Sequence, residues 1–257
     1  MTGRRHSGRR ELGVFALAYL TYFGVRAVTQ GSLPRATRDA LDVMRLERHL
    51  GIGVERSVQA LIAGSRTLVD LANGLYIWGH WPVLILGGVA LFRLAPEHYV
   101  RLRNVCLLSG AVGLVVFAVF PVAPPRLAPS GLVDTIARHA TAYRTVLPTA
   151  LVNEYAAMPS LHAGWNLMLG IELFRSTRHL ALRAFAVAMP AAMAFAVVAT
   201  ANHYVLDVVA GATVVCVALV IVTWFEHHPA AAPPASTSWG SRVRRTTDFA
   251  PAGSSHT

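Results

Sequence analysis

Six stretches of mostly apolar residues, each close to the length that a helix needs to cross a lipid bilayer, constrain the fold of this chain most strongly. A helix crosses the hydrocarbon core with about 20 apolar residues. Because 54% of the 257 residues are hydrophobic and only 14% are charged, the chain is too apolar for an ordinary soluble domain. The stretches cover residues 11–30, 69–92, 104–120, 160–175, 184–201 and 203–224. We therefore predict an all-α polytopic membrane protein with six transmembrane helices in a bundle.

The arginines predict the orientation of this bundle. The chain has no lysine, and four groups of arginines lie before the first stretch, between the second and third, between the fourth and fifth, and after the sixth. Six more arginines lie in residues 31–68, where Asp39, Asp42, Glu47 and Glu55 nearly offset them. Six crossings place all four groups on one side, which the positive-inside rule makes cytoplasmic. Both termini are then cytoplasmic, and residues 31–68 and 121–159 face outward. The Arg-, Ala- and Val-rich composition without lysine suggests a GC-rich bacterial source, and so a multi-pass protein of a bacterial plasma membrane.

The net charge of +10 does not indicate a nucleic-acid partner, because the arginines lie in short segments between apolar stretches and form no basic stripe interleaved with aromatic residues. The expected partners are membrane lipids. The sequence carries no signal for an oligomeric state.

Three regions are expected along the chain: a cytoplasmic N-terminus at residues 1–10, a six-helix membrane domain at residues 11–227, and a cytoplasmic tail at residues 228–257. The tail is rich in Pro, Ala, Ser and Thr, a composition typical of disorder. Within the outward segment, apolar residues recur near helical spacing over residues 35–62 with charged residues between them. This pattern predicts an amphipathic helix at the interface of the outer leaflet.

Polar residues cluster at the outward ends of the predicted helices. His203 and Asp207 are four residues apart at the start of the sixth stretch, so they share a helix face and can hydrogen-bond. A carboxylate on one imidazole nitrogen fixes the tautomer and leaves the other nitrogen as a nucleophile, base or ligand. The same pair could instead hold helices together, which is a common use of polar residues in membranes.

Two further segments bring chemistry to the same side. Ser160 and His162 follow Pro159 at the start of the fourth stretch, where free backbone N–H groups and the helix dipole favour an anion. Arg126, in a proline-stiffened loop, can bind phosphate oxygens bidentately. Together these residues suit phosphoryl transfer: His203 attacks phosphorus, His162 protonates the departing oxygen, and Arg126 and Ser160 bind the phosphate.

A metal site is an alternative use of the same residues, because His162, His203 and Asp207 match a two-His, one-carboxylate ligand set. The arginine and the helix N-terminus favour an anion over a bare cation, so we expect neither a metal nor another cofactor. Further residues could line the pocket or bond neighbouring helices: Asn73, Tyr76 and His80 on one face of the second stretch, Asn166 one turn after His162, and Asn202 beside His203.

These residues resemble the motifs of the type 2 phosphatidic acid phosphatase superfamily, in particular its branch similar to inositolphosphorylceramide synthases and inositolphosphotransferases. The matching segments are P-P-R at 124–126, P-S-L-H at 159–162 and N-H-Y-x-x-D at 202–207 followed by Gly211, and the similarity covers roughly residues 40–224. The resemblance implies a six-helix core, a phosphohistidine at His203 relayed by Asp207, acid catalysis by His162, phosphate binding by Arg126 and Ser160, and no metal requirement.

The chain departs from the pattern of that superfamily at three positions. Val119 stands where its first motif has Lys, Leu127 stands where Pro usually follows the Arg, and Val197 stands where its third motif has Arg. These departures favour the inositolphosphotransferase-like branch. Arg144 or another outward arginine could replace the missing cations.

We therefore expect a metal-independent membrane enzyme that transfers a phosphoryl or phospho-headgroup from a lipid phosphate to water or to an alcohol. A small transporter is one alternative, although the two halves of the chain show no matching helix interruptions. A protein that binds lipid phosphate without turnover is another alternative.

Overall fold

The computed structural model describes residues 8–28, 31–139 and 154–228, and every regular element in this part of the chain is an α-helix. The expected N-terminal region and tail lie almost entirely outside the described residues. The helices, in chain order, are α1 (Gly8–Val28), α2 (Leu33–Leu50), α3 (Glu55–Ala63), α4 (Arg66–Trp78), α5 (Trp81–Leu94), α6 (Pro96–Val119), α7 (Thr135–His139), α9 (Leu161–Ser176), α10 (Leu180–Ala199) and α11 (Val205–His227).

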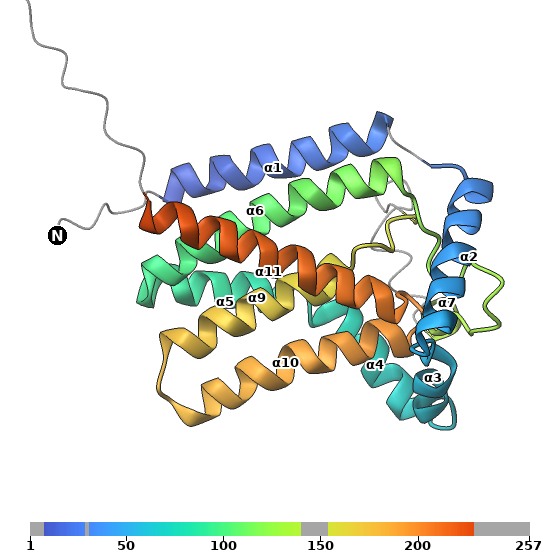
Figure 1. Cartoon of the computed structure of the whole chain (residues 1–257). Coiled ribbons are helices and arrows are strands. Elements are labelled where there is room, and N and C mark those ends of the chain that lie inside the picture. The colour runs from blue at the N-terminus through green and yellow to red at the C-terminus, as the bar shows by residue number, and fades with distance from the viewer. Residues whose placement is uncertain (1–7, 29–30, 140–153, 229–257) are drawn as a thin grey trace, which may run out of the picture.

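The long helices run side by side as a bundle, and α2 lies across one end of it (Figure 1). Three of them, α6, α10 and α11, are long and apolar enough to cross a membrane, and α4 with α5 adds a fourth if that bent pair is one span. α9 has 16 residues, fewer than the ~20 that a full crossing needs. The all-helical membrane fold thus agrees with the sequence, whereas the six-span topology stays a prediction.

The second predicted span is broken rather than continuous. α4 ends at Trp78, α5 begins at Trp81, and the two helices meet at an angle of 48°. Pro82 explains the break, because its ring lacks an N–H and clashes with the carbonyl group one turn earlier. His80 lies at this break and is 2% exposed, so the interruption places a histidine inside the protein.

The predicted amphipathic segment forms two helices, α2 and α3, instead of one. Gly51 ends α2 with a φ of 69°, a left-handed conformation that glycine adopts without strain. The face that packs onto the protein carries small residues and a carboxylate, whereas the leucines of the predicted apolar stripe point away from the protein. The buried residues are Ala36, Ala40, Val43 and Glu47, and the exposed ones include Leu46, Leu50 and Leu61.

α9 occupies the centre of the bundle, where it contacts α5, α6, α10 and α11. Its buried Met168, Leu169 and Leu173 belong to the main apolar cluster, together with residues of the four surrounding helices. A second cluster joins α2 to the loops at the end of the bundle and includes Ala40, Val122, Ala157 and Tyr204. This second cluster surrounds the candidate site.

Candidate active site

Backbone hydrogen bonds bring the three polar segments together at the end of the bundle covered by α2. The amide of Arg126 donates to the carbonyl oxygen of Ala201 at 3.0 Å, and the amide of Ser160 donates to that of Asp207 at 2.9 Å. The loop that contains Arg126, the start of α9 and the start of α11 therefore meet directly, although they are 34 to 81 residues apart in sequence. This is the convergence that the sequence predicted.

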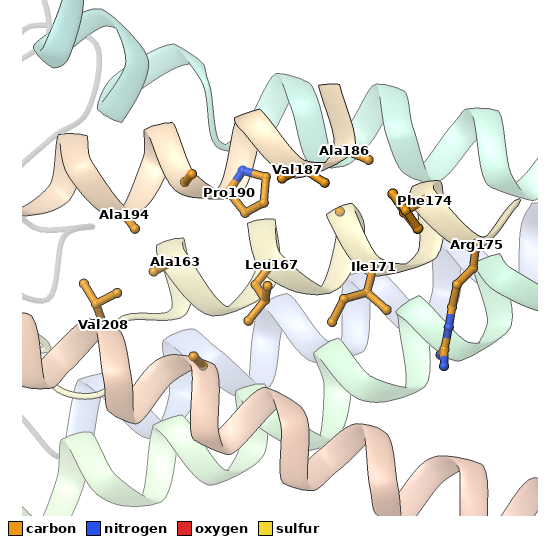
Figure 2. A pocket seen from close by; sticks show the side chains of 13 residues that line it. Ala163, Leu167, Ile171, Phe174, Arg175, Ala186, Val187, Pro190, Ala194 and Val208 are labelled. Carbon is orange, nitrogen blue, oxygen red and sulfur yellow. The ribbon is translucent and has the colours of Figure 1, made fainter. Parts of the chain in front are cut away.

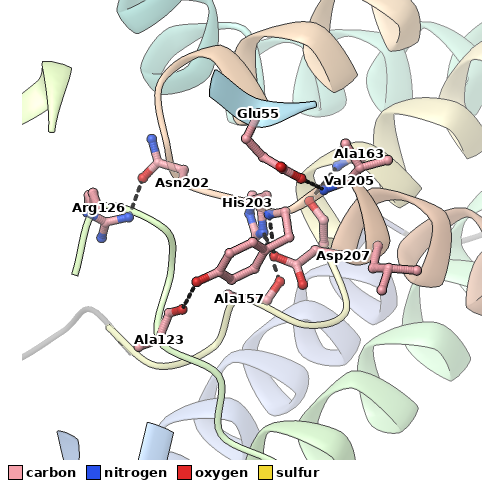
Figure 3. A network of polar contacts seen from close by, with 12 residues as sticks. Glu55, Ala123, Arg126, Ala157, Ala163, Asn202, His203, Val205 and Asp207 are labelled. Atoms are coloured by element: carbon pink, nitrogen blue, oxygen red, sulfur yellow. Dashed lines mark hydrogen bonds and ion pairs between the residues drawn. The ribbon is translucent and has the colours of Figure 1, made fainter. Parts of the chain in front are cut away.

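His203 is 5% exposed and lies in the short connection between α10 and α11. Its Nδ1 atom is 2.8 Å from the carbonyl oxygen of Ala157 and 3.3 Å from Oδ2 of Asp207 (Figure 3). Since a carbonyl oxygen can only accept a hydrogen bond, Nδ1 carries the proton of the neutral ring. Nε2 is then unprotonated and holds the lone pair that a nucleophile needs.

The connection that carries His203 is tightly constrained. Ala201 has a φ of 58°, which is an uncommon conformation for a residue with a side chain. The amides of Asn202 and His203 both donate to the carbonyl oxygen of Val197 at 3.0 Å. These contacts end α10 and turn the chain into α11, so strain is stored beside the candidate nucleophile, as is common at active sites.

Asp207 is completely buried in the first turn of α11. Its Oδ2 accepts a hydrogen bond from the amide of Tyr204 at 2.8 Å, in addition to its contact with His203. Asp207 therefore caps its own helix and faces the imidazole with the same oxygen atom. Both histidine and carboxylate are held by the backbone, which fixes their relative positions.

His162 is the second residue of α9. Its ring centroid is 6.1 Å from that of His203. Tyr76 stacks on the His162 ring at 5.0 Å, and the His80 ring lies 4.2 Å away. The two side chains from the broken α4–α5 segment thus pack against the candidate general acid.

Asn166 connects the same histidines. Its amide Nδ2 lies 2.8 Å from Nδ1 of His80 and donates to the carbonyl oxygen of His162 at 2.8 Å. Of the three residues predicted to share a face of the second stretch, Tyr76 and His80 reach His162. Asn73 does not: it is hydrogen-bonded to Thr135 of α7 through both its amide and its carbonyl oxygen.

Ser160 caps α9, and its Oγ accepts a hydrogen bond from the amide of Ala163 at 3.4 Å. The residue is fully buried. Gly211 of α11 packs directly against it, since a Cβ atom at position 211 would overlap the carbonyl oxygen of Ser160. The glycine that follows the third motif therefore allows α11 to approach the beginning of α9.

Arg126 points toward the connection that carries His203. Its Nη1 donates to Oδ1 of Asn202 at 2.5 Å, and its Nε lies 3.7 Å from a carboxylate oxygen of Asp134 (Figure 3). Asn202 in turn donates to the hydroxyl group of Thr200 at 2.8 Å. The guanidinium is thus held beside the site, where its remaining N–H groups can face an anion.

The structure shows the surroundings of Val197 and Val119, two positions where the superfamily motifs carry a cation. Val197 is fully buried in an apolar cluster with Met193 and Val198, where a charged side chain would lose its solvation. Val119 is 61% exposed, and its carbonyl oxygen accepts a hydrogen bond from Arg35 at 2.5 Å. Arg144, the suggested replacement cation, lies outside the described residues.

Sequence reasoning missed three groups at this site. The carbonyl group of Ala157 carries no sequence signal, because every residue has one. Glu47 and Glu55 were read as charges on a surface helix, yet they are 2% and 8% exposed and accept hydrogen bonds from the first amides of α11. The only sequence signal for these glutamates was that charged residues stand between the apolar positions of residues 35–62.

The metal site considered as an alternative has no matching arrangement of side chains: the described residues contain no group of three His, Cys, Asp or Glu side chains placed to hold a metal ion.

A hollow of about 530 Å³ lies between α9, α10 and α11 (Figure 2). It is lined by apolar residues such as Leu167 and Ile171, with Arg175 at one end. None of the candidate catalytic residues lines it.

The family model described as PAP2 superfamily matches residues 41–221, a range that contains all three polar segments. The chain belongs to the PAP2 superfamily, whose members are generally phosphatase-type enzymes. Searches of curated proteins and of solved structures found no match.

Proposed function

We propose that this protein is a membrane enzyme that transfers a phosphoryl or phospho-headgroup from a lipid phosphate through a phosphohistidine on His203. The observation that carries the proposal is the contact between Nδ1 of His203 and the carbonyl oxygen of Ala157. It leaves Nε2 as the free nucleophilic nitrogen in a site that also contains His162 and Arg126. Membership of the PAP2 superfamily supports phosphatase or phosphotransferase chemistry in general.

In the first half-reaction, the lone pair of Nε2 forms a bond to phosphorus while the bond from phosphorus to the leaving oxygen breaks. His162 gives its proton to that oxygen. In the second half-reaction, water or an alcohol attacks the phosphorus, His162 takes the proton of the attacking oxygen, and the N–P bond breaks. Arg126 and the amides at the start of α9 stabilise the charge on the phosphate oxygens.

The lipid nature of the substrate is supported by three helices that are apolar enough to cross a membrane. We further propose that the site faces outward from a bacterial plasma membrane, with both termini in the cytoplasm, because the arginine groups favour this orientation. The departures at Val119, Leu127 and Val197 favour an inositolphosphotransferase-like branch, with water or an alcohol as the acceptor.

The test uses the full chain purified in detergent, a panel of phosphatidate, isoprenyl phosphates and pyrophosphates, and inositol lipids, and an excess of EDTA. Phosphate release or headgroup transfer to an added alcohol is measured for the wild type and for His203→Ala. We expect activity in the wild type and at least a 10³-fold loss in the variant, because the covalent route is removed.

His49→Ala is the matched control, since His49 is an exposed histidine on α2. It should retain wild-type activity. Full activity of His203→Ala would rule out the phosphohistidine, and activity that EDTA abolishes in the wild type would return the metal alternative. No turnover of any lipid, with or without an alcohol, would favour lipid-phosphate binding without catalysis.

A further inference from the structure

The first turn of α11 begins inside the protein and needs partners for its amides. The first N–H groups of a helix have no partner within the helix, and leaving them unpaired in a buried place is costly. Tyr204 is 1% exposed and Asp207 is completely buried. Asp207 accepts from the amide of Tyr204. The next two amides are those of Val205 and Leu206.

Two glutamates from distant helices accept these amides. Val205 donates to Oε1 of Glu55 at 3.0 Å, and Leu206 donates to Oε1 of Glu47 at 2.8 Å. Figure 3 shows Glu55 reaching Val205 next to His203. The glutamates precede these amides by 150 and 159 residues in sequence, so this is a tertiary contact and not a local cap.

The turn between α2 and α3 brings the two carboxylates to one side. Glu47 lies in the last turn of α2, and Glu55 is the first residue of α3. The left-handed Gly51 reverses the chain between them, and the amide of Ile52 donates to the carbonyl oxygen of Glu47 at 3.0 Å. The pair is therefore presented to α11 by a fixed piece of backbone.

Burying two carboxylates side by side disfavours their charged forms. Loss of water raises the pKa of Glu47 to about 8, and the neighbouring Glu55, which hydrogen-bonds to it, and Asp207 raise it as well. The raised pKa favours the protonated form of Glu47 at neutral pH. Its Oε1 accepts the amide of Leu206 at the positive end of the α11 dipole, where an acceptor is favoured.

Two other helix starts in the bundle use simpler caps. Ser160 caps α9 and Ser65 caps α4, each with its own hydroxyl group. A helix start can be stabilised by one such side chain. Two remote, buried carboxylates cost more, and the two amides that they hold lie between His203 and Asp207 in sequence.

We propose that Glu47 and Glu55 are positioning residues that hold the first turn of α11 so that His203 stays aligned with Ala157 and Asp207. The catalytic half of this proposal rests on the proposed function of His203. The positional half does not, and it can be measured without turnover. A displacement of about 1 Å in a reacting group can lower a rate by ~10²-fold.

The experiment compares Glu47→Ala with Glu47→Gln, and Glu55→Ala with Glu55→Gln, in the full chain in detergent. Glutamine keeps the accepting oxygen, and alanine removes it. Asp42→Ala is the control, because Asp42 is an exposed carboxylate of α2 whose partner is Arg45 of the same helix. Thermal unfolding is recorded for each variant to separate folding from positioning.

The first readout is the Cε1–H resonance of His203 in protein labelled at histidine, assigned by its loss in His203→Ala. We expect it to shift in the alanine variants and to stay within the wild-type range in the glutamine and Asp42→Ala variants. The second readout is turnover: kcat should fall roughly 10- to 100-fold in the alanine variants with KM changed less than threefold, and glutamine should restore it.

An unshifted resonance and unchanged kcat in folded alanine variants would overturn the proposal, as would equal losses with glutamine and alanine. If an alanine variant does not fold, the result rests on its glutamine partner, whose loss of kcat would count against the proposal. A shifted resonance in a protein that turns over no lipid would keep the positional role and reject the proposed function.

Discussion

Nδ1 of His203 lies closer to the carbonyl oxygen of Ala157, at 2.8 Å, than to Oδ2 of Asp207, at 3.3 Å. The backbone carbonyl group therefore fixes the tautomer of the imidazole. In the proposed mechanism, Asp207 contributes mainly its negative charge, which would stabilise the positive charge that develops on the ring during phosphoryl transfer. Here the carbonyl group fixes the tautomer and the carboxylate supplies the charge, whereas the single Asp of a Ser-His-Asp triad does both.

This division predicts a moderate effect for Asp207→Asn. The amide removes the charge, but its oxygen can still accept from Tyr204, and Ala157 still holds the tautomer. We expect kcat to fall by about 10²- to 10³-fold, less than the ~10⁴-fold seen where an Asp→Asn change also reverses the tautomer. Steady-state turnover of the best lipid substrate, with thermal unfolding as a folding check, measures this. A loss as large as that of His203→Ala would show that Asp207 alone orients the ring.

The close approach of α9 and α11 predicts a sharp effect for Gly211→Ala. The added methyl group would overlap the carbonyl oxygen of Ser160, so the start of α9 has to move away. Overpacking of this kind costs about 1–3 kcal/mol, and it displaces His162, two residues further along. We expect a lower midpoint of thermal unfolding and at least a tenfold lower kcat.

Gly88→Ala provides the comparison for this variant. Gly88 lies within α5 with no atom close to the place of an added Cβ. Alanine is the better helix former by roughly 0.5–1 kcal/mol, so this variant should be as stable as the wild type or more so, with unchanged activity. Equal behaviour of the two variants would mean that the α9–α11 contact does not position the site.

Much of this site follows from the sequence because its side chains sit at fixed places relative to apolar stretches. The four-residue spacing predicts that His203 and Asp207 meet, and the stretch that begins at residue 160 places His162 at a helix start. The break at His80 was not predicted, because the stretch 69–92 is long enough for one continuous span, although Pro82 is a sequence signal for an interruption. Arg126 contacts Asn202 in the structure, a partner that the sequence did not indicate.

The glutamates were missed for a different reason. Periodicity places a residue on a helix face, but it does not say which face another part of the chain covers. The apolar spacing of residues 35–62 predicted a helix at the membrane interface and did not say which of its residues meet the protein, whereas in the structure Ala36, Ala40 and Val43 are buried and Leu46 is half exposed. A contact between Glu47 and an amide 159 residues later is a property of tertiary structure alone.

The raised pKa of Glu47 predicts how stability depends on pH. Its pKa is about 8 in the folded protein and 4.5 in the absence of burial, so the folded state binds the proton more tightly than the unfolded state. This contribution to stability is complete below about pH 4.5 and is lost as the pH rises to about 8. Glu55, Asp207 and Tyr204 are the titratable groups that interact with it.

Thermal unfolding in detergent at pH 5.5 and 8.5 tests this. The midpoint temperature of the wild type should be lower at pH 8.5 than at pH 5.5. The decrease should be smaller for Glu47→Gln, because glutamine has no proton to lose in this range. Asp42→Asn should follow the wild type, because Asp42 is exposed. Parallel behaviour of wild type and Glu47→Gln would show that Glu47 is already ionised at pH 5.5.

The role of His162 can be separated from simple packing by the leaving group of the substrate. Its ring packs against the rings of Tyr76 and His80, and its centroid is 6.1 Å from that of His203. A general acid matters most when the departing oxygen is a poor leaving group, since a good one departs without a proton. For His162→Ala we therefore expect a loss of about 10²- to 10⁴-fold in kcat with an alkyl phosphate, and a much smaller loss with an aryl phosphate such as p-nitrophenyl phosphate. Packing alone would lower both rates by the same factor, so an equal loss would assign His162 a structural role and leave the departing oxygen to be protonated by water.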